Sequence, residues 1–282
     1  MKNLTGQQRT KQVLEIVFQA FCILLGIALM APVLYCVIIS FMHESEIVST
    51  ELHLWPEEFY LGNYIAVITQ TKIFRFMLNS FIVAFIYSLA RIFTASLAAY
   101  AFSFFTFRGK NLLFLLVLGT MIVPAEMLMV QNYFTTAELG LINTYMGMMI
   151  IYLVSGANIF LIRQHFMNYS KDVRDASLVD GCGNWRFFWK ILLPMSGPVI
   201  ATVFISSFVN VWTTYLWPLL VTNVEEMRTV QVIITMLNSS ELTSAYGQVM
   251  AASVLILIPS IAVFVLFQRK ITEGMMAGAV KG

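Results

Sequence analysis

The sequence predicts an all-α, polytopic membrane protein that crosses the bilayer six times and keeps both termini in the cytoplasm. Three observations lead to this fold class. Of the 282 residues, 59% are hydrophobic and only 11% are charged, whereas a soluble domain carries about a quarter charged residues. The apolar residues form runs long enough to span a bilayer. Lysine and arginine concentrate in alternate connections between these runs.

Six spans are expected, at about 14–41, 77–106, 111–131, 145–163, 197–221 and 248–268. The first run follows Lys2, Arg9 and Lys11. It is longer than the apolar core of a signal peptide, and no small-x-small cleavage site follows it, so it is interpreted as an uncleaved span. The chain shows no repeat or low-complexity linker, which predicts a single membrane domain over residues 1–282.

The placement of basic residues sets the expected orientation. With a cytoplasmic N-terminus, the outer loops hold only Lys72, Arg75 and Arg228, and Arg91 lies within a span. The other basic residues all fall on the inner side: Lys2, Arg9, Lys11, Arg108, Lys110, Arg163, Lys171, Arg174, Arg186, Lys190, Arg269, Lys270 and Lys281. The opposite orientation would invert this bias, so both termini are expected inside.

The outer connections differ in length and composition. The longest, about 42–76, contains five glutamates, and its part from Tyr60 to Phe76 alternates apolar and polar residues, which indicates an interfacial helix. Two further outer loops are expected at about 132–144 and 222–247. Pro124 and Pro259 fall within spans and Pro218 closes the fifth, so breaks that line a cavity, or simple kinks, are expected there.

The polar stretch from Asp175 to Pro194 lies in the longest inner loop, about 164–196. Its pattern predicts a short helix, a turn at Gly181 and Gly183, a second short helix rich in aromatic residues, and a proline before the next apolar run. Such a compact projection with small residues on its exposed side suits docking into a groove on another protein.

This stretch resembles the EAA loop of ABC importer membrane subunits. The resemblance rests on the spacing of Asp175-Ala176-Ser177, Asp180-Gly181, Ile191 and Leu193-Pro194, with Asp and Ser where the family usually has Glu and Ala. It extends from Asn63-Tyr64 to the final residues, Ala277 to Gly282, which are similar to the tail of carbohydrate-type permeases. It implies that ATPase coupling is carried by Asp175, Ala176, Ser177, Asp180, Gly181, Leu193 and Pro194.

The resemblance also implies the remaining parts of the machine. These are a homologous second permease, two ATPase subunits that bind ATP and Mg, and an extracytoplasmic solute-binding protein, assembled in the bacterial cytoplasmic (inner) membrane. The solute is expected to be a carbohydrate, with glycerol-3-phosphate or a related polyol phosphate as the alternative. An ion-driven secondary transporter and a membrane-embedded enzyme are the rival classes.

Two charged residues mark a candidate pathway through the membrane. Arg91 lies deep in the second expected span, where a charge costs several kcal/mol on insertion scales. Glu126 lies at a similar expected depth on the antiparallel third span. Their pairing is one hypothesis; in the alternative, Arg91 faces the partner subunit or extends its side chain toward the interface.

Polar and aromatic residues extend the candidate pathway to the fourth and fifth spans. Trp212, Tyr215 and Trp217 are spaced for stacking on sugar rings or, alternatively, for an aromatic belt at the interface. Asn158 and Asn210 are further candidates, although a lone asparagine in a span often serves an interhelical hydrogen bond.

No catalytic or metal-binding residues are predicted. Cys22, Cys36 and Cys182 are scattered, no C-x-x-C pair or H-E-x-x-H motif occurs, and His43, His53 and His165 are isolated. No G-x-x-x-x-G-K-[ST] phosphate loop is present. The chain is therefore expected to hold no cofactor, to be a transport subunit rather than an enzyme, and to depend on a separate ATPase. Few acidic residues lie within the spans, which disfavours the ion-driven carrier.

Overall fold

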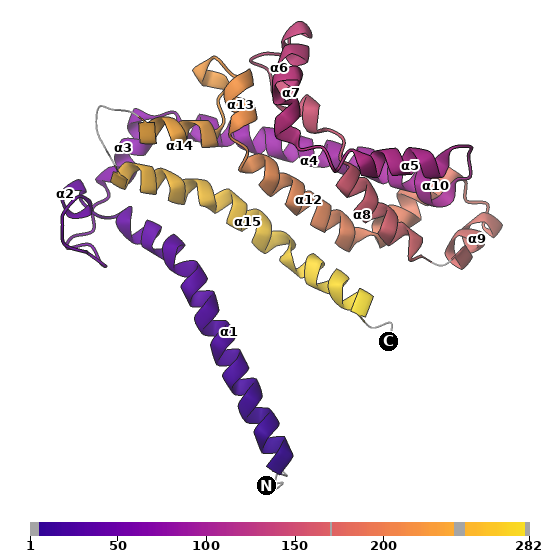
Figure 1. Ribbon diagram of the computed structural model, residues 1–282, viewed down its shortest axis with the longest axis horizontal. Helices are drawn as coiled ribbons and strands as arrows, with labels where there is room; N and C mark the ends of the chain where they lie inside the picture. The colour runs from indigo at the N-terminus through magenta and orange to yellow at the C-terminus, as the bar shows by residue number, and fades with distance from the viewer. Residues whose placement is uncertain (1–5, 170, 240–245, 280–282) are drawn as a thin grey trace. The chain divides into compact units, whose positions relative to one another are not determined.

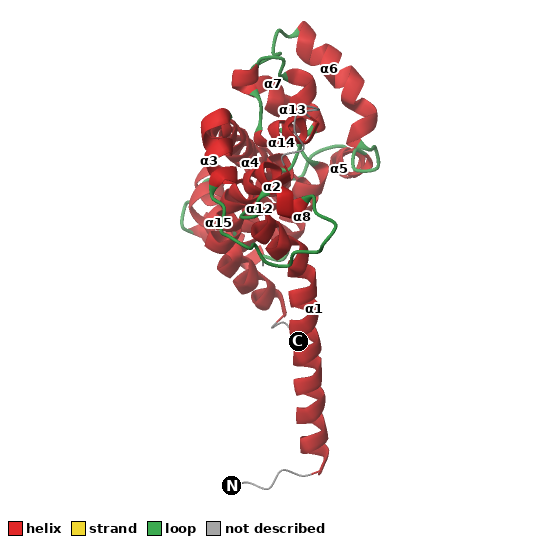
Figure 2. Ribbon diagram, turned by 90° about the vertical axis from the view of Figure 1, so that its left-hand side faces the viewer, coloured by secondary structure: helices red, strands yellow, loops and turns green. Residues whose placement is uncertain are grey.

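The structure, a computed structural model, describes residues 6–169, 171–239 and 246–279. Every regular element in these ranges is a helix, as Figure 2 shows. The all-α fold class is thereby confirmed. The last three residues of the tail, 280–282, lie outside the described residues.

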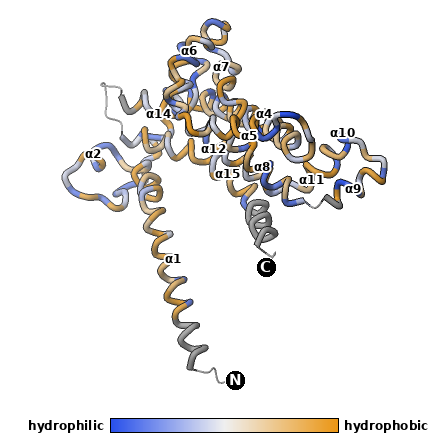
Figure 3. The backbone as a smooth tube through the Cα atoms, turned by 45° about the vertical axis from the view of Figure 1, so that its right-hand side comes forward, coloured by the Kyte–Doolittle hydropathy of each residue, from blue (hydrophilic) through white to orange (hydrophobic). Residues whose placement is uncertain are grey.

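Three helices are long and apolar enough to cross a membrane by themselves. They are α1 (Gly6–Ile39), α4 (Ile73–Phe104) and α15 (Tyr246–Ala279), with apolar stretches at Leu14–Ile39, Ile73–Phe104 and Tyr246–Gln268. They match the first, second and sixth expected spans. The side chains of α1 from Leu14 to Met30 are exposed. Most of this stretch is hydrophobic, as the colouring in Figure 3 shows, so this helix suits contact with lipid or another chain.

The expected span 111–131 is not one continuous helix, which corrects the sequence prediction. It consists of α5 (Lys110–Gly119), the 3-10 turn η1 (Ala125–Leu128) and α6 (Met129–Glu138). Pro124 adopts extended backbone (φ −60°, ψ 131°). Because Pro124 has no N–H to donate to the carbonyl of Thr120, a helix cannot continue through this position without losing a hydrogen bond.

The expected span 145–163 is also broken, here without a proline. It divides into α7 (Tyr145–Met149), η2 (Ile150–Tyr152) and α8 (Gly156–Met167), and the two parts are bent by 58°. Ser155 begins α8 by accepting a hydrogen bond from the backbone N–H of Asn158 at 3.4 Å, as N-cap residues do.

The expected span 197–221 divides into α12 (Gly197–Trp212) and α13 (Leu216–Val221). Pro218 lies within α13 rather than closing the span, and it denies the Thr214 carbonyl a helical partner, which explains the break just before α13. In contrast, α15 runs through Pro259 and α1 through Pro32 without interruption. Of the three prolines noted in the sequence, Pro259 is therefore not at a break.

The chain divides into two compact units, residues 1–71 with 237–255, and residues 72–236 with 256–282. The first unit contains α2 (Glu44–Ile47) and α3 (Gly62–Gln70); α3 is the helix expected within Tyr60–Phe76. The buried Asn63 amide donates to the carbonyls of Ser40 and Met42 at 3.0 and 2.9 Å. The Glu44 carboxylate accepts from the first N–H groups of α15, at Tyr246 and Gly247.

In the second unit α4 packs lengthwise against α12 and α8 (Figure 1). One buried cluster lies around Tyr100, Phe166, Phe187 and Phe188, and another around Tyr87, Met148 and Trp217. The segment expected as the last outer loop contains η4 (Glu225–Met227) and α14 (Val230–Ser239). These contacts fix α4 as the central helix of the unit.

Candidate functional site: the loop before α12

The loop from α9 to α12 has the arrangement that its sequence predicts. It contains α9 (Lys171–Val179), a turn at Gly181, α10 (Asn184–Phe187), a π-helical stretch, η3 (Phe188–Leu192), and α11 (Leu193–Met195). Pro194 lies in α11, directly after η3, where it has no N–H to continue the helical hydrogen bonds. The α10–α11 segment meets α12 at an angle of 77°.

Gly181 ends α9 in a Schellman motif. Its φ is +68°, its N–H donates to the Leu178 carbonyl at 3.0 Å, and the N–H of Cys182 donates to the Ser177 carbonyl at 2.8 Å. These two hydrogen bonds satisfy carbonyls that the helix end would leave without partners. A β-carbon added at Gly181 would meet nothing within 4 Å, so the need for glycine in this chain comes from the backbone angle.

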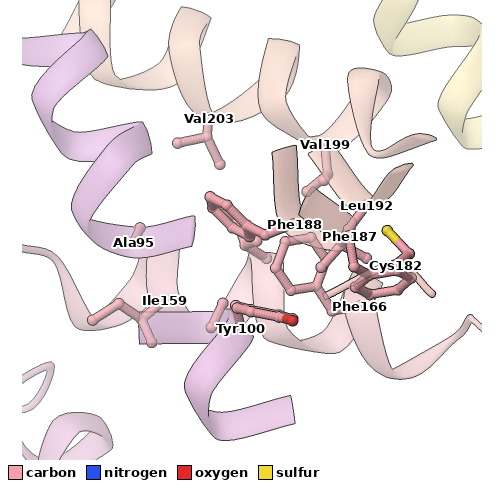
Figure 4. Close-up of a cluster of buried hydrophobic side chains, with 12 residues drawn as sticks. Ala95, Tyr100, Ile159, Phe166, Cys182, Phe187, Phe188, Leu192, Val199 and Val203 are labelled. Carbon is pink, nitrogen blue, oxygen red and sulfur yellow. The ribbon is translucent and has the colours of Figure 1, made fainter. Parts of the chain in front are cut away.

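The loop is anchored by aromatic packing on the end of α4. Phe187 and Phe188 are buried, and the centroids of the Tyr100 and Phe188 rings are 5.1 Å apart. Figure 4 shows these side chains gathered in one cluster. The Tyr100 hydroxyl donates to the Asn184 carbonyl at 3.0 Å. The Arg174 guanidinium lies 4.6 Å from the Phe187 ring centroid and donates to the Asn184 side-chain oxygen. The loop is thereby joined firmly to α4.

The predicted coupling residues divide between the surface and the interior of the loop. Asp175, Ala176, Asp180, Gly181 and Pro194 are exposed, and Leu193 is half-buried. Ser177 is buried, and its hydroxyl donates to the Arg174 carbonyl at 2.6 Å, so a small residue is required there. Leu178 and Val179 leave 53% and 88% of their surface exposed. α9 therefore presents a mixed face of small, acidic and apolar side chains.

The expected pairing of Arg91 with Glu126 is not observed. Among the described residues, the ion pairs are those of Lys72 with Glu225 and Glu226. Glu126 is exposed on η1, whereas Arg91 lies 5.0 Å from the Tyr87 ring centroid and its buried Nε has no hydrogen-bond partner. The broken third span removes the regular antiparallel register on which the pairing depended.

The polar and aromatic pathway candidates lie in different surroundings. Asn158 donates to the Ser207 hydroxyl at 3.3 Å, which links α8 to α12, and Asn210 is exposed. Trp212 is buried and stacked on Phe208 at 5.7 Å between centroids, so its face is not open to a solute here. Tyr215 is half-buried between α12 and α13. Trp217 is fully buried and donates to the Gly147 carbonyl at 3.1 Å.

A hydrogen-bonded clasp around Asn79 was not foreseen from the sequence. The buried Asn79 amide donates to the carbonyls of Glu226 and Arg228 at 2.8 and 3.0 Å, and its oxygen accepts from the Tyr145 hydroxyl at 2.8 Å. One side chain thus joins α4, α7 and the segment after α13. The one sign of this arrangement in the sequence is an asparagine within an apolar run. An isolated asparagine does not indicate which distant residues it will contact.

An exposed group of ion pairs lies next to the Asn79 hydrogen bonds. Lys72 donates to the Glu225 and Glu226 carboxylates at 2.8 and 3.3 Å. Hydrogen bonds from the Glu226 backbone N–H and from Lys72 lower the pKa of the Glu226 carboxyl, and those carboxylates raise the pKa of Lys72. Because these groups are exposed, their contribution is screened by solvent and salt.

The described residues contain no group of three or more His, Cys, Asp or Glu side chains that would hold a metal ion. The three cysteines are free thiols. The prediction that the chain itself holds no cofactor is not tested by these observations.

Apolar helices, broken spans and a rigidly anchored polar loop together define a membrane permease. The chain belongs to the family described as "Binding-protein-dependent transport system inner membrane component", which it matches over residues 16–276. Members of this family are the permease subunits of ABC importers, as the resemblance in the loop predicted.

Curated relatives include two proteins described as sn-glycerol-3-phosphate transport system permease protein UgpE. The protein of Yersinia enterocolitica is 36% identical over 226 residues, covering 79% of this chain and 80% of the relative. The protein of Agrobacterium fabrum is 32% identical over 263 residues, covering 90% of this chain and 93% of the relative. Both descriptions name permeases of a transport system.

A solved structure has the same fold. It is a bacterial ABC transporter involved in the import of the acidic polysaccharide alginate, with a TM-score of 0.79, 21% identity, and coverage of 95% of this chain and 99% of that one. At this identity the likeness shows the fold alone.

Proposed function

We propose that this chain is the permease subunit of an importer for a small acidic, carbohydrate-type solute, sn-glycerol 3-phosphate or a related polyol phosphate. The observation that carries the proposal is the similarity to glycerol-3-phosphate permeases over most of both chains. The sequence left two solute classes open, a carbohydrate and a polyol phosphate. This similarity favours the polyol phosphate over a neutral sugar. The second candidate is a neutral sugar or oligosaccharide, the carbohydrate class whose permeases have a tail similar to residues 277–282.

The proposed transporter has three kinds of partner around this chain, four subunits in all. A homologous permease completes the pathway, two ATPase subunits bind ATP and Mg, and a solute-binding protein delivers cargo from outside the bacterial cytoplasmic membrane. In this arrangement the chain crosses the bilayer six times with both termini inside. The helices α1, α4 and α15, the bent pair α7–α8, and α12 with α13 supply five crossings, and α5 with η1 and α6 supplies the sixth.

Coupling is proposed to pass through the loop before α12. The exposed Asp175, Ala176, Asp180 and Gly181 contact a cleft in the ATPase, while the buried Ser177 and the half-buried Leu193 hold the loop's shape. The aromatic packing on Tyr100 makes the loop and α4 move together. Closure of the ATPase pair then shifts the spans between inward-open and outward-open states, provided that ATP and loaded binding protein favour the same state.

Purification of the tagged chain from its native membranes tests the proposal. An ATPase, a second permease and a binding protein are expected to co-purify, and the complex in liposomes is expected to import labelled sn-glycerol 3-phosphate only with ATP. Preference for maltotriose would favour the neutral-sugar candidate. Uptake that needs an ion gradient but no ATPase would replace the importer with a secondary carrier.

A further inference from the structure

Arg91 lies in the middle of α4 without a counter-charge. It is 13 residues before the last residue of the helix, Phe104, which is about 20 Å along the axis. Its side chain is half-buried and its Nε is buried without a hydrogen-bond partner. The ion pairs of the described residues involve other side chains. A cation in such a place requires a polar partner or water.

The surroundings of Arg91 place it beside the break in the fourth span. One turn before it, the Tyr87 ring packs edge-on against that of Tyr152, with centroids 6.2 Å apart. One turn after it, the Thr94 hydroxyl donates to the Leu153 carbonyl at 2.8 Å. Because residues four before and three after share one face of a helix, Arg91 lies on the same face as these two contacts.

This break also presents the first turn of α8. The helix begins at Gly156, directly after the residues that contact Tyr87 and Thr94. The start of a helix carries a partial positive charge, although Ser155 already caps the Asn158 N–H here, and breaks in membrane spans place such ends next to a pathway. A cation and a helix start on one side of α4 together favour an anion.

Two tyrosines, Tyr87 and Tyr152, lie next to Arg91 and limit where a bound anion could be. The guanidinium lies over the Tyr87 ring at 5.0 Å, which restricts its orientation. Tyr152 packs against the same Tyr87 ring and so lies near Arg91. It also lines a small cavity together with Ser80 and Thr214. The Arg91 neighbourhood therefore combines one fixed charge with the Tyr87 hydroxyl, which is also buried without a hydrogen-bond partner.

We propose that Arg91, with Tyr152, is the contact for the acidic group of the solute, a phosphate or carboxylate on a small polyol, as it passes through the membrane. The planar guanidinium presents paired donors that fit the oxygens of such a group. This inference rests on the proposed import function, and it adds the residue that discriminates for charge.

The test uses the full complex in liposomes, with sn-glycerol 3-phosphate as the solute. Arg91→Gln is expected to lower uptake per ATP hydrolysed by about tenfold or more, the effect of losing a hydrogen bond to a charged group. ATP hydrolysis stimulated by the loaded binding protein is expected to stay within about twofold of wild type, because delivery and coupling do not use Arg91. Arg91→Lys keeps the charge without the planar donors. Its uptake per ATP hydrolysed is expected to lie between that of wild type and that of Arg91→Gln.

Two controls separate this role from other partners of Arg91. Arg108→Gln removes a charge from the exposed turn before α5 and is expected to leave uptake unchanged. Glu126→Gln is also expected to leave it unchanged; a loss equal to that of Arg91→Gln would identify Glu126 as the partner and overturn the inference.

The remaining outcomes also decide the question. If Arg91→Gln reduces the amount of assembled complex, with uptake and ATP hydrolysis falling together, Arg91 serves a carboxylate of the partner permease and the inference is wrong. If uptake is unchanged, the partner is a lipid headgroup or water, and the inference again fails. A wild-type complex that imports nothing with ATP would instead refute the proposed function.

Discussion

Glycine is required at Gly181 by its backbone angle, and this requirement can be tested separately from contact with a partner subunit. Its φ of +68° and the open space around it predict that Gly181→Ala costs about 1–2 kcal/mol of local backbone strain without a clash inside this chain. Gly183, at φ −66° and also in open space, is the matched control, and Gly183→Ala is expected to be neutral. Limited proteolysis of the loop measures the difference.

A charged side chain at Gly181 tests docking rather than backbone strain. Gly181→Asp is expected to leave the permease in the membrane and to abolish solute-stimulated ATP hydrolysis, because an added carboxylate would face the proposed ATPase cleft. The readouts are the membrane content of the chain and the ATPase activity of the reconstituted complex. Normal transport by this variant would contradict the coupling role of the loop.

Single residues also mark the limit of sequence reasoning. The loop could be predicted because glycine and proline restrict the backbone at Gly181 and Pro194 whatever surrounds them. The Asn79 clasp could not, because its partners at Tyr145, Glu226 and Arg228 are brought together only by the fold. The Arg91–Glu126 pairing, one of two hypotheses for Arg91, is not observed, because it assumed equal rise along two unbroken helices.

At the scale of elements, α1, α4 and α15 agree with the sequence prediction, because a long apolar run of the right length already defines a span. The third to fifth spans do not. These spans have breaks at Pro124, at residues 153–155 and before Pro218, and apolar composition alone does not indicate them. Composition also does not distinguish a proline that ends a helix from one inside a helix, such as Pro259. The breaks depend on packing that satisfies the freed carbonyls.

The packing of α7 leads to a prediction about stability. The N–H of Gly147 donates to the Thr144 hydroxyl at 3.0 Å, its carbonyl accepts from Trp217, and a β-carbon there would overlap the Leu141 carbonyl oxygen. Gly147→Ala is expected to destabilise the second unit by about 1–3 kcal/mol, the usual cost of overpacking. A thermal melt of the solubilised complex measures this loss. Gly119→Ala, at the end of α5 in open space, should leave the melting temperature unchanged; equal shifts would show that overpacking at α7 is not the cause.

At the scale of the whole molecule, the distribution of basic residues predicts which ends of the spans face the cytoplasm. In a background without Cys22, Cys36 and Cys182, Asn223→Cys in the exposed segment after α13 should react with an impermeant thiol reagent in intact cells. Arg108→Cys, in the exposed turn before α5, should react only after permeabilisation. Reversed labelling would overturn the proposed orientation and, with it, the cytoplasmic position of the coupling loop.

The contact that joins this chain to its energy source gives the last prediction. Ala176 is exposed on α9, whereas its neighbour Ser177 is buried and bonded to the Arg174 carbonyl. In the same cysteine-free background, Ala176→Cys should form a disulfide with a cysteine in the ATPase cleft, and Ser177→Cys should not, since its side chain points into the loop. In the proposed transporter the ATPase subunits bind ATP, so an effect of ATP on this chain passes through contacts such as this one. The Ala176 cross-link is therefore expected to change in yield with nucleotide. A yield that is equal at both positions, or one that ignores nucleotide, would contradict the proposed docking of α9.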